Sequence, residues 1–228
     1  MDLNKIFVAL DYQNFDDTKN LVETLGDDFK CYKVGQPLYT VAGNEIIKFL
    51  KDKGKRIFLD LKFFDIPSVI MKAAENLVKQ EIDFFTVHSL AGSELLGEIA
   101  GIVKDSKTTP LGVTILTSIA ESKIADVLLI EKDFDQTMKI LINRIIDSRI
   151  PGLVCSPKEI DLVRSINTKI LIVTPGIRLE KDSVGDQSRI MTPGEAMKAG
   201  SNYLVMGRSI TGAQDPKQIV EQLKSIVI

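Results

Sequence analysis

Eight short apolar runs alternate with helical segments along the chain, with a repeat of roughly 25–30 residues. Nearly continuous apolar strands that alternate with helices are typical of a parallel sheet covered by helices. Eight such units within 228 residues predict an α/β fold, a closed (β/α)8 TIM barrel, that forms a single domain over residues 1–228. The predicted strands are residues 6–11, 31–35, 57–62, 83–88, 111–116, 152–155, 170–174 and 203–206.

Helix signals fill the intervals between these strands. Residues 134–148 place their apolar side chains on one face, and Ser156 and Thr192 each open a capping box that marks a helix start. The alternative fold is a doubly wound open sheet. It would need a glycine-rich nucleotide fingerprint after the first strand, where the chain has Asp11-Tyr12-Gln13-Asn14. The other predicted helices are residues 16–25, 37–53, 68–80, 93–103, a segment through 125–129, and one that Asp215 caps.

Charge and cysteine content restrict the class of protein. The net charge is −2 and no run is rich in lysine and arginine, which argues against nucleic acid or an anionic membrane as a partner. No apolar stretch reaches the ~18 residues of a membrane span, and the residues after Met1 do not resemble a signal peptide. Cys31 and Cys155 lie in apolar runs without metal-ligand spacing or a disulfide framework. We therefore expect a soluble cytoplasmic protein with two buried free thiols.

The third predicted strand carries two opposite charges, Asp60 and Lys62, inside an apolar run. Side chains two residues apart leave a strand on the same face, so both should point into the barrel. A further acid, Asp65, precedes Pro67, which ends the strand before a helix begins. An isolated Asp-x-Lys pair is as readily a structural ion pair. Buried charges are costly unless paired, however, and they often mark functional sites.

Polar and charged residues gather at the predicted strand ends, where barrels of this kind place their active sites. Lysines and aspartates alternate among them, so the array balances its own charge and can hold an ammonium group in a fixed position. The candidates are Asp11, Lys33, Asp60, Lys62, Asp65, Thr117, Ser118, Arg178, Gln187, Gly207 and Arg208.

Two of these segments favour a phosphate site. Gly207-Arg208 ends the eighth strand, where backbone N–H groups and a guanidinium can hold a dianion. Residues 175–190 form a long, polar, glycine-bearing loop after the seventh strand, as a closing lid would. The only histidine, His88, ends the fourth strand and is interpreted as a structural, hydrogen-bonded group. It belongs to no cluster that would form a zinc site, so no metal is expected.

The motif Asp60-x-Lys62-x-x-Asp65-Ile66-Pro67 resembles the signature of the orotidine 5′-phosphate decarboxylase family, in its bacterial branch. The Asp-x-Lys part alone is shared with related sugar-phosphate decarboxylases and synthases, whereas its combination with the other matching segments is specific. The resemblance covers the whole chain and includes residues 8–11, 32–35, 116–118, 175–178, 185–187 and 207–208.

This resemblance implies decarboxylation of orotidine 5′-phosphate to UMP in pyrimidine biosynthesis, without metal or organic cofactor. It also implies a homodimer in which Asp65 and Ile66 reach the partner's site. Lys62 would stabilise and protonate a carbanion at C6 of the pyrimidine, and Asp60 would lie beside the substrate carboxylate. The other implied substrate contacts are Asp11 and Lys33 with the ribose, Thr117 and Ser118 with the pyrimidine, Gln187 with phosphate and base, Gly207 and Arg208 with the phosphate, and Ile66, Pro67 and Arg178 nearby.

Two residues depart from the family pattern. Val69 and Phe64 stand where the family usually has threonine and often has histidine, so we expect somewhat weaker substrate binding. Three rival functions remain open. The first is a metal-dependent decarboxylase of a keto-sugar phosphate, which would need an acidic metal ligand near the end of the first or second strand together with Asp60, whereas Lys33 occupies the second-strand position. The others are a nucleotide-binding barrel without turnover and a Schiff-base aldolase built on Lys62 or Lys33.

Overall fold

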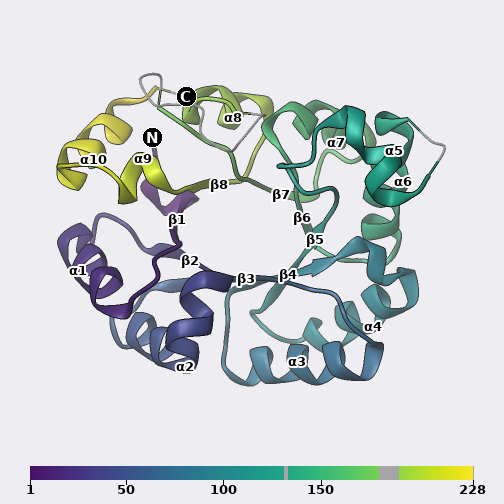
Figure 1. Ribbon diagram of the computed structural model, residues 1–228, viewed down its shortest axis with the longest axis horizontal. Coiled ribbons are helices and arrows are strands. Elements are labelled where there is room, and N and C mark those ends of the chain that lie inside the picture. The colour runs from purple at the N-terminus through teal and green to yellow at the C-terminus, as the bar shows by residue number, and fades with distance from the viewer. Residues whose placement is uncertain (131–132, 180–189, 228) are drawn as a thin grey trace.

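The computed structural model describes residues 1–130, 133–179 and 190–227. Eight strands close into a barrel in chain order, and every neighbouring pair is parallel (Figure 1). The predicted (β/α)8 barrel is therefore confirmed. Its strands are β1 (Ile6–Leu10), β2 (Cys31–Gly35), β3 (Arg56–Phe63), β4 (Phe84–His88), β5 (Thr109–Val113), β6 (Gly152–Val154), β7 (Leu171–Thr174) and β8 (Tyr203–Met206).

The helices surround the barrel, and their starts follow the capping signals in the sequence. Asn14 accepts a hydrogen bond from the Asp17 N–H at 2.8 Å, and Glu195 accepts one from the Thr192 N–H at 3.0 Å. The helices are α1 (Phe15–Leu25), α2 (Gln36–Asp52), α3 (Pro67–Lys79), α4 (Ser93–Val103), α5 (Ile124–Leu128), α6 (Phe134–Asp147), α7 (Ile160–Ile166), α8 (Pro193–Ala199), α9 (Arg208–Thr211) and α10 (Pro216–Ser225).

Most elements match their predicted bounds to within one or two residues, and three differences are larger. Strand β5 (Thr109–Val113) is shifted from the predicted residues 111–116, because β4 pairs with it from Thr109 to Val113, whereas β6 pairs with it only from Leu111 onward. The capping box at Ser156 opens a 3-10 turn, and α7 follows it. The short helix α9 directly after β8 has no amphipathic pattern long enough to predict it.

The core consists of two layers. The larger layer lies between the barrel and the helices. The smaller one fills the barrel interior, where the ring of Phe7 lies 5.3 Å from that of Phe58 and 5.2 Å from that of Phe84. Tyr203 packs against Phe84 at 5.4 Å. These edge-to-face contacts form an apolar floor across the barrel.

The charged residues stand one interior position above this floor. Alternate residues of a strand share a face, so the step from Phe58 to Asp60 on β3 leads from aromatic to acidic. The same step on β2 leads from Cys31 to Lys33. Both cysteines are buried thiols outside any disulfide, as predicted. The barrel thus carries its charges above a dry, packed layer.

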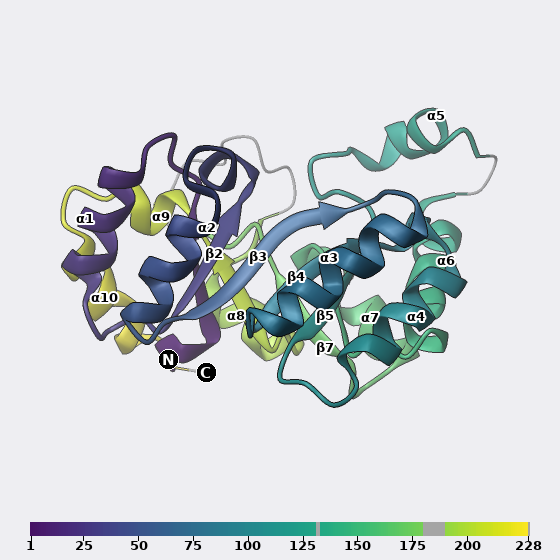
Figure 2. The same cartoon turned by 90° about the horizontal axis from the view of Figure 1, so that it is seen from below.

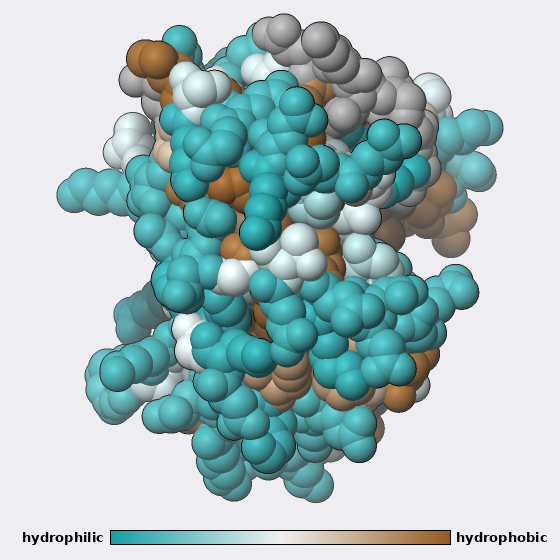
Figure 3. All heavy atoms as spheres, turned by 90° about the vertical axis from the view of Figure 1, so that its left-hand side faces the viewer, coloured by the Kyte–Doolittle hydropathy of each residue, from teal (hydrophilic) through white to brown (hydrophobic). Residues whose placement is uncertain are grey.

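Figure 2 shows the barrel from the side, with both chain termini at one end and the segment that carries α5 extending beyond the other end. The outer surface over α1 and α10 is largely hydrophilic (Figure 3). Within the described part of the chain, no helix has the length and apolar character needed to cross a membrane.

Candidate active site

A cavity of about 550 Å³ lies at the carboxyl ends of the strands. Its volume falls within the range typical of small-molecule sites. Tyr12 and Thr211 line it together with apolar residues of the interior. The predicted site residues that line the cavity are Asp11, Lys33, Asp60, Lys62, Thr117, Ser118, Arg178, Gly207 and Arg208.

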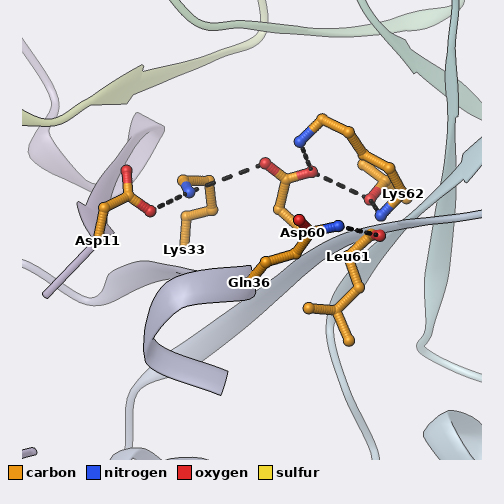
Figure 4. A network of polar contacts seen from close by, with 7 residues as sticks. Asp11, Lys33, Gln36, Asp60, Leu61 and Lys62 are labelled. Atoms are coloured by element: carbon orange, nitrogen blue, oxygen red, sulfur yellow. Dashed lines mark hydrogen bonds and ion pairs between the residues drawn. The ribbon is translucent and has the colours of Figure 1, made fainter. Parts of the chain in front are cut away.

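Four charged side chains form a row of alternating sign along one side of this cavity, directly above the apolar floor (Figure 4). The Lys33 Nζ lies 2.8 Å from Asp11 Oδ1 and 3.8 Å from Asp60 Oδ2. The Lys62 Nζ donates to Asp60 Oδ1 at 2.9 Å. The two inner side chains, of Lys33 and Asp60, are only 9% and 14% exposed, whereas that of Lys62 is 37% exposed. The row is therefore buried at its centre, and Lys62 is the more exposed of the two lysines that line the cavity.

Asp60 is held ionised by its neighbours. Burial alone would raise its pKa, but the positive charges of Lys33 and Lys62 outweigh this effect. Hydrogen bonds from Lys62 and Thr86 act in the same direction, so the pKa of Asp60 is lowered from its ordinary value. A carboxylate next to two ammonium groups therefore persists inside the barrel at neutral pH.

Asp60 and Lys62 meet as predicted, but the route differs from simple strand alternation. Between Leu59 and Phe63 the register of β3 against β4 shifts, and Lys62 lies within this bulge with φ 51°. That is the left-handed region, which costs a non-glycine residue about 1–2 kcal/mol. The backbone at Lys62 is thus strained in the conformation that brings its ammonium group back to Asp60.

The outer ion pair of the row depends on a glycine. A Cβ atom added at Gly35 would lie 2.6 Å from Asp11 Oδ1 and 2.9 Å from Lys33 Nζ. Gly35 has φ −93° and ψ 176°, which any residue can adopt. The absence of a side chain, rather than backbone freedom, is what leaves room for the ion pair.

His88 is a hydrogen-bonded group beside the site, as predicted. Its Nδ1 accepts from the Leu90 N–H at 3.3 Å, which places the proton of the neutral ring on Nε2. The ring packs against Phe64 with 5.6 Å between centroids. Burial, and then the charge of Lys62, lower the pKa of His88. The imidazole is therefore neutral at neutral pH.

The phosphate candidates frame another side of the cavity. Gly207 caps α9 and Arg208 is its first residue, so the backbone N–H groups at the start of α9 and a guanidinium lie together at the cavity. A parallel β-bridge between Ile177 and Met191 joins the two ends of the loop after β7. Arg178 is only 8% exposed. Gln187, the predicted lid residue, lies outside the described residues.

Asp65, Ile66 and Pro67 do not line the cavity. Asp65 accepts a hydrogen bond from the Ile66 N–H at 2.7 Å at the exposed junction of β3 and α3. Ile66 is 63% exposed, and Phe64 nearby is 62% exposed. This chain alone thus brings these residues near the rim rather than into its own cavity.

Sequence reasoning missed three residues of the site. Tyr12 donates from its hydroxyl to the Thr211 carbonyl at 3.1 Å, which links the end of β1 to α9. Its pKa is raised by burial and then by Asp17. Its position next to Asp11 was the available signal. Thr86 contacts Asp60 from within an apolar strand, where nothing in the sequence marks it.

Known proteins share this architecture over nearly the whole chain. Residues 4–223 match the Orotidine 5′-phosphate decarboxylase / HUMPS family. The chain belongs to this family. An orotidine 5′-phosphate decarboxylase of Dictyoglomus turgidum is 39% identical, over 96% of this chain and 93% of the relative. One of Streptococcus sanguinis is 36% identical over 95% of each chain.

Solved structures give the same result. The crystal structure of orotidine 5′-phosphate decarboxylase from Lactobacillus acidophilus superposes with a TM-score of 0.85 at 34% identity, and 97% of each chain is covered. An uncharacterised conserved protein from Geobacillus kaustophilus superposes with a TM-score of 0.83 at 28% identity. Both solved structures thus share the fold of this chain.

Proposed function

We propose that this protein is an orotidine 5′-phosphate decarboxylase, which converts orotidine 5′-phosphate to UMP in pyrimidine biosynthesis. The observation that carries the proposal is the row Asp11–Lys33–Asp60–Lys62, which lines a cavity of suitable size in a member of this family. Relatives that match nearly the whole chain bear this name.

Lys62 is the proposed general acid. When the C6–carboxylate bond breaks, CO2 leaves and its bonding electrons remain on C6 of the pyrimidine. The Lys62 ammonium faces the cavity and stabilises this negative charge before it donates a proton to C6. The resulting amine regains its proton from solvent. The left-handed backbone at Lys62 fixes the start of the side chain, so little reorganisation is needed during the reaction.

Asp60 is the proposed partner of the substrate carboxylate. Its ionised side chain repels the substrate carboxylate, since like charges in a buried site interact strongly. Loss of CO2 relieves that repulsion, so Asp60 favours the transition state over the bound substrate. It also holds the Lys62 ammonium in place at 2.9 Å.

The remaining cavity residues are proposed to bind the ends of the nucleotide. Gly207 and Arg208 are suited to the phosphate, because a glycine that lets a ligand approach the backbone and a guanidinium both line this part of the cavity. Thr117 and Ser118 offer hydroxyls to the pyrimidine edge. Binding energy at the phosphate, remote from C6, can then lower the barrier to decarboxylation.

The outer pair of the row, Asp11 and Lys33, is proposed to bind the ribose hydroxyls. Gln187 stays a predicted bridge between phosphate and base. Somewhat weaker substrate binding through Val69 and Phe64, a single domain over residues 1–228 and a cytoplasmic location also stay predictions.

A metal-dependent keto-sugar phosphate decarboxylase is the main competing activity. Lys33 occupies the space between the Asp11 and Asp60 carboxylates, so a cation there would have to displace an ammonium group. Within the described residues, no three His, Cys, Asp or Glu side chains gather as a metal-binding group. Decarboxylation of orotidine 5′-phosphate in the presence of EDTA separates the two activities.

The direct test follows the ultraviolet absorbance of orotidine 5′-phosphate with the purified protein. We expect turnover by the wild type and a loss of at least about a thousandfold in kcat for Lys62→Ala. Lys72→Ala, an exposed lysine on α3, is the matched control and should keep wild-type rates. A wild-type protein that binds UMP but leaves orotidine 5′-phosphate intact would refute the proposed activity.

A homodimer with shared sites is proposed for the exposed junction after β3. Phe64, Ile66 and Val69 expose 62%, 63% and 46% of their surface there, next to the rim of the cavity, and a second copy would cover them. Asp65 projects from the same junction. It would complete the partner's site rather than its own.

Mixing two inactive variants tests the shared site. A heterodimer of Lys62→Ala and Asp65→Ala chains has both changes in one site and neither in the other. After random exchange, half the dimers would be mixed, so about a quarter of wild-type activity should return. Sedimentation establishes whether dimers form. If dimers exchange and no activity returns, Asp65 does not act across the interface.

A further inference from the structure

A buried threonine occupies the point where β3 departs from regular pairing. Leu59 pairs with Phe85 and Phe63 with Val87, so four steps along β3 face two steps along β4. Thr86 is the β4 residue opposite this bulge, and its side chain is fully buried. A bulge leaves backbone groups without their ladder partners. The residue opposite it is therefore placed to satisfy them.

The Thr86 hydroxyl makes two hydrogen bonds. Its Oγ1 accepts from the Lys62 backbone N–H at 2.8 Å and donates to Asp60 Oδ1 at 3.0 Å. The same Asp60 oxygen accepts from the Lys62 ammonium at 2.9 Å (Figure 4). The Lys62 ammonium thus reaches this carboxylate oxygen directly, and the Lys62 backbone N–H is linked to it through the Thr86 hydroxyl, which closes the ring.

We propose that Thr86 is a positioning residue that holds Lys62 in its left-handed conformation and fixes the orientation of Asp60. The role rests on the proposed function, because it acts through the two groups assigned to the reaction. Without the hydroxyl, a strained backbone loses the hydrogen bond of its N–H, and Asp60 loses one of its donors. The ammonium can then move away from the position in which it faces the cavity.

Thr86→Val and Thr86→Ser separate the hydroxyl from the shape of the side chain. Valine keeps the branched shape in a fully buried position but lacks the oxygen, whereas serine keeps the oxygen. We expect Thr86→Val to lower kcat for orotidine 5′-phosphate roughly 10–100-fold with UMP affinity little changed, since misplacement of a reacting group costs this much. Thr86→Ser should stay within about threefold of the wild type.

The pH profile distinguishes positioning from a loss of packing. The charged groups around Asp60 are Lys33 and Lys62, with Asp11 behind Lys33 and His88 beside Lys62. Loss of a donor raises the pKa of Asp60 toward its ordinary value. The acid limb of kcat should therefore move to higher pH in Thr86→Val and not in Thr86→Ser.

A measurement without turnover keeps this proposal separate from the proposed function. In protein labelled with [15N]lysine, the Lys62 amide should exchange slowly in the wild type and Thr86→Ser, and faster in Thr86→Val. An inactive wild type that keeps this pattern would refute the activity and leave the hydrogen-bonded ring standing. Wild-type kcat together with unchanged amide exchange in Thr86→Val would overturn the proposal. If the valine variant does not fold, Thr86→Ala removes the same hydroxyl without adding a methyl group.

Discussion

Gly35→Ala should disable the charge row while leaving the fold intact. The added Cβ would lie 2.6 Å from Asp11 Oδ1 and 2.9 Å from Lys33 Nζ, closer than real Cβ contacts. Asp11 is half exposed and can turn into solvent, but Lys33 is 9% exposed and would keep only the Asp60 carboxylate, 3.8 Å away. The expected loss therefore comes from the buried Lys33 ammonium, which loses its nearest carboxylate.

The expected loss follows from that partial burial. Exposed ion pairs contribute about 0–1 kcal/mol, and breaking a fully buried pair costs about 3–5 kcal/mol. A pair with one buried and one half-exposed member should fall between these, at about 1.4–2.8 kcal/mol. Because Asp11 and Lys33 are proposed to bind the substrate, we expect a loss of similar size in transition-state binding, which is a drop in kcat/KM of roughly 10–100-fold.

Stability should respond differently from activity. The backbone at Gly35 suits alanine, and such a replacement stabilises by about 0.4–1 kcal/mol through the unfolded chain. This gain offsets only part of the loss from the displaced ion pair, so the free energy of unfolding in urea should fall by about 0.4–2.4 kcal/mol. Gly97→Ala in α4, where an added Cβ meets nothing within 4 Å, is the control with unchanged kinetics.

A double-mutant cycle identifies the contact responsible. If Gly35→Ala acts by displacing Asp11, its effect on kcat/KM should shrink in an Asp11→Ala background, where that carboxylate is absent. Wild-type kcat/KM in Gly35→Ala would show that the row tolerates the added methyl group. An equal loss in both backgrounds would show that Asp11 is not the group displaced.

Three further predictions concern protonation and stability. His88 is the only histidine, so its C2 proton gives a single NMR signal, which should titrate with a pKa below 6.5. Lys62→Ala should raise that pKa, because the charge of Lys62 is one of the two effects that lower it, the other being burial. An unchanged titration would refute the influence of Lys62. Because the folded-state pKa of Asp60 is lowered, the stability linked to its ionisation is present above the unfolded value of about 3.9 and is lost as the pH falls through the folded value. The difference in free energy of unfolding between wild type and Asp60→Asn should therefore fall on acidification below about pH 4, and a difference independent of pH would contradict this. The guanidinium of Arg164 donates hydrogen bonds to the carbonyls of Ile170 and Gly200 and to others nearby. Arg164→Ala should therefore lower the free energy of unfolding in urea by about 2–4 kcal/mol, and Arg164→Lys should restore little of it. Wild-type stability in the alanine variant would refute this role.

The barrel was predictable because its strands are buried on both faces and read as apolar runs at a regular interval. The location of the site was predictable for a related reason. A charged residue in such a strand is expected to point into the barrel near the carboxyl end of the strand, and parallel strands bring these ends to one rim. Asp60 and Lys33 could therefore be placed together from the sequence.

The rest depends on contacts between strands, which one strand's sequence does not encode. Alternation assigned Asp60 and Lys62 to one face, but the bulge that achieves it arises from the pairing of β3 with β4. Thr86 is a β-branched residue in an apolar strand, and only the partner strand gives its hydroxyl a role. Gly35 reads as the residue before a helix, although its significance is the ion pair above it.

The row of two carboxylates and two ammonium groups has no net charge, which bears directly on the proposed reaction. A bound substrate carboxylate adds one negative charge beside Asp60, above an aromatic floor that screens poorly. As CO2 leaves, the charge moves to C6, closer to the Lys62 ammonium, and protonation of C6 neutralises it. The same row thus opposes the carboxylate and favours the carbanion. For this reason the proton donor cannot be exchanged freely for an uncharged one: Lys62→Met would leave Asp60 one ammonium group short, and both substrate binding and turnover should fall with it.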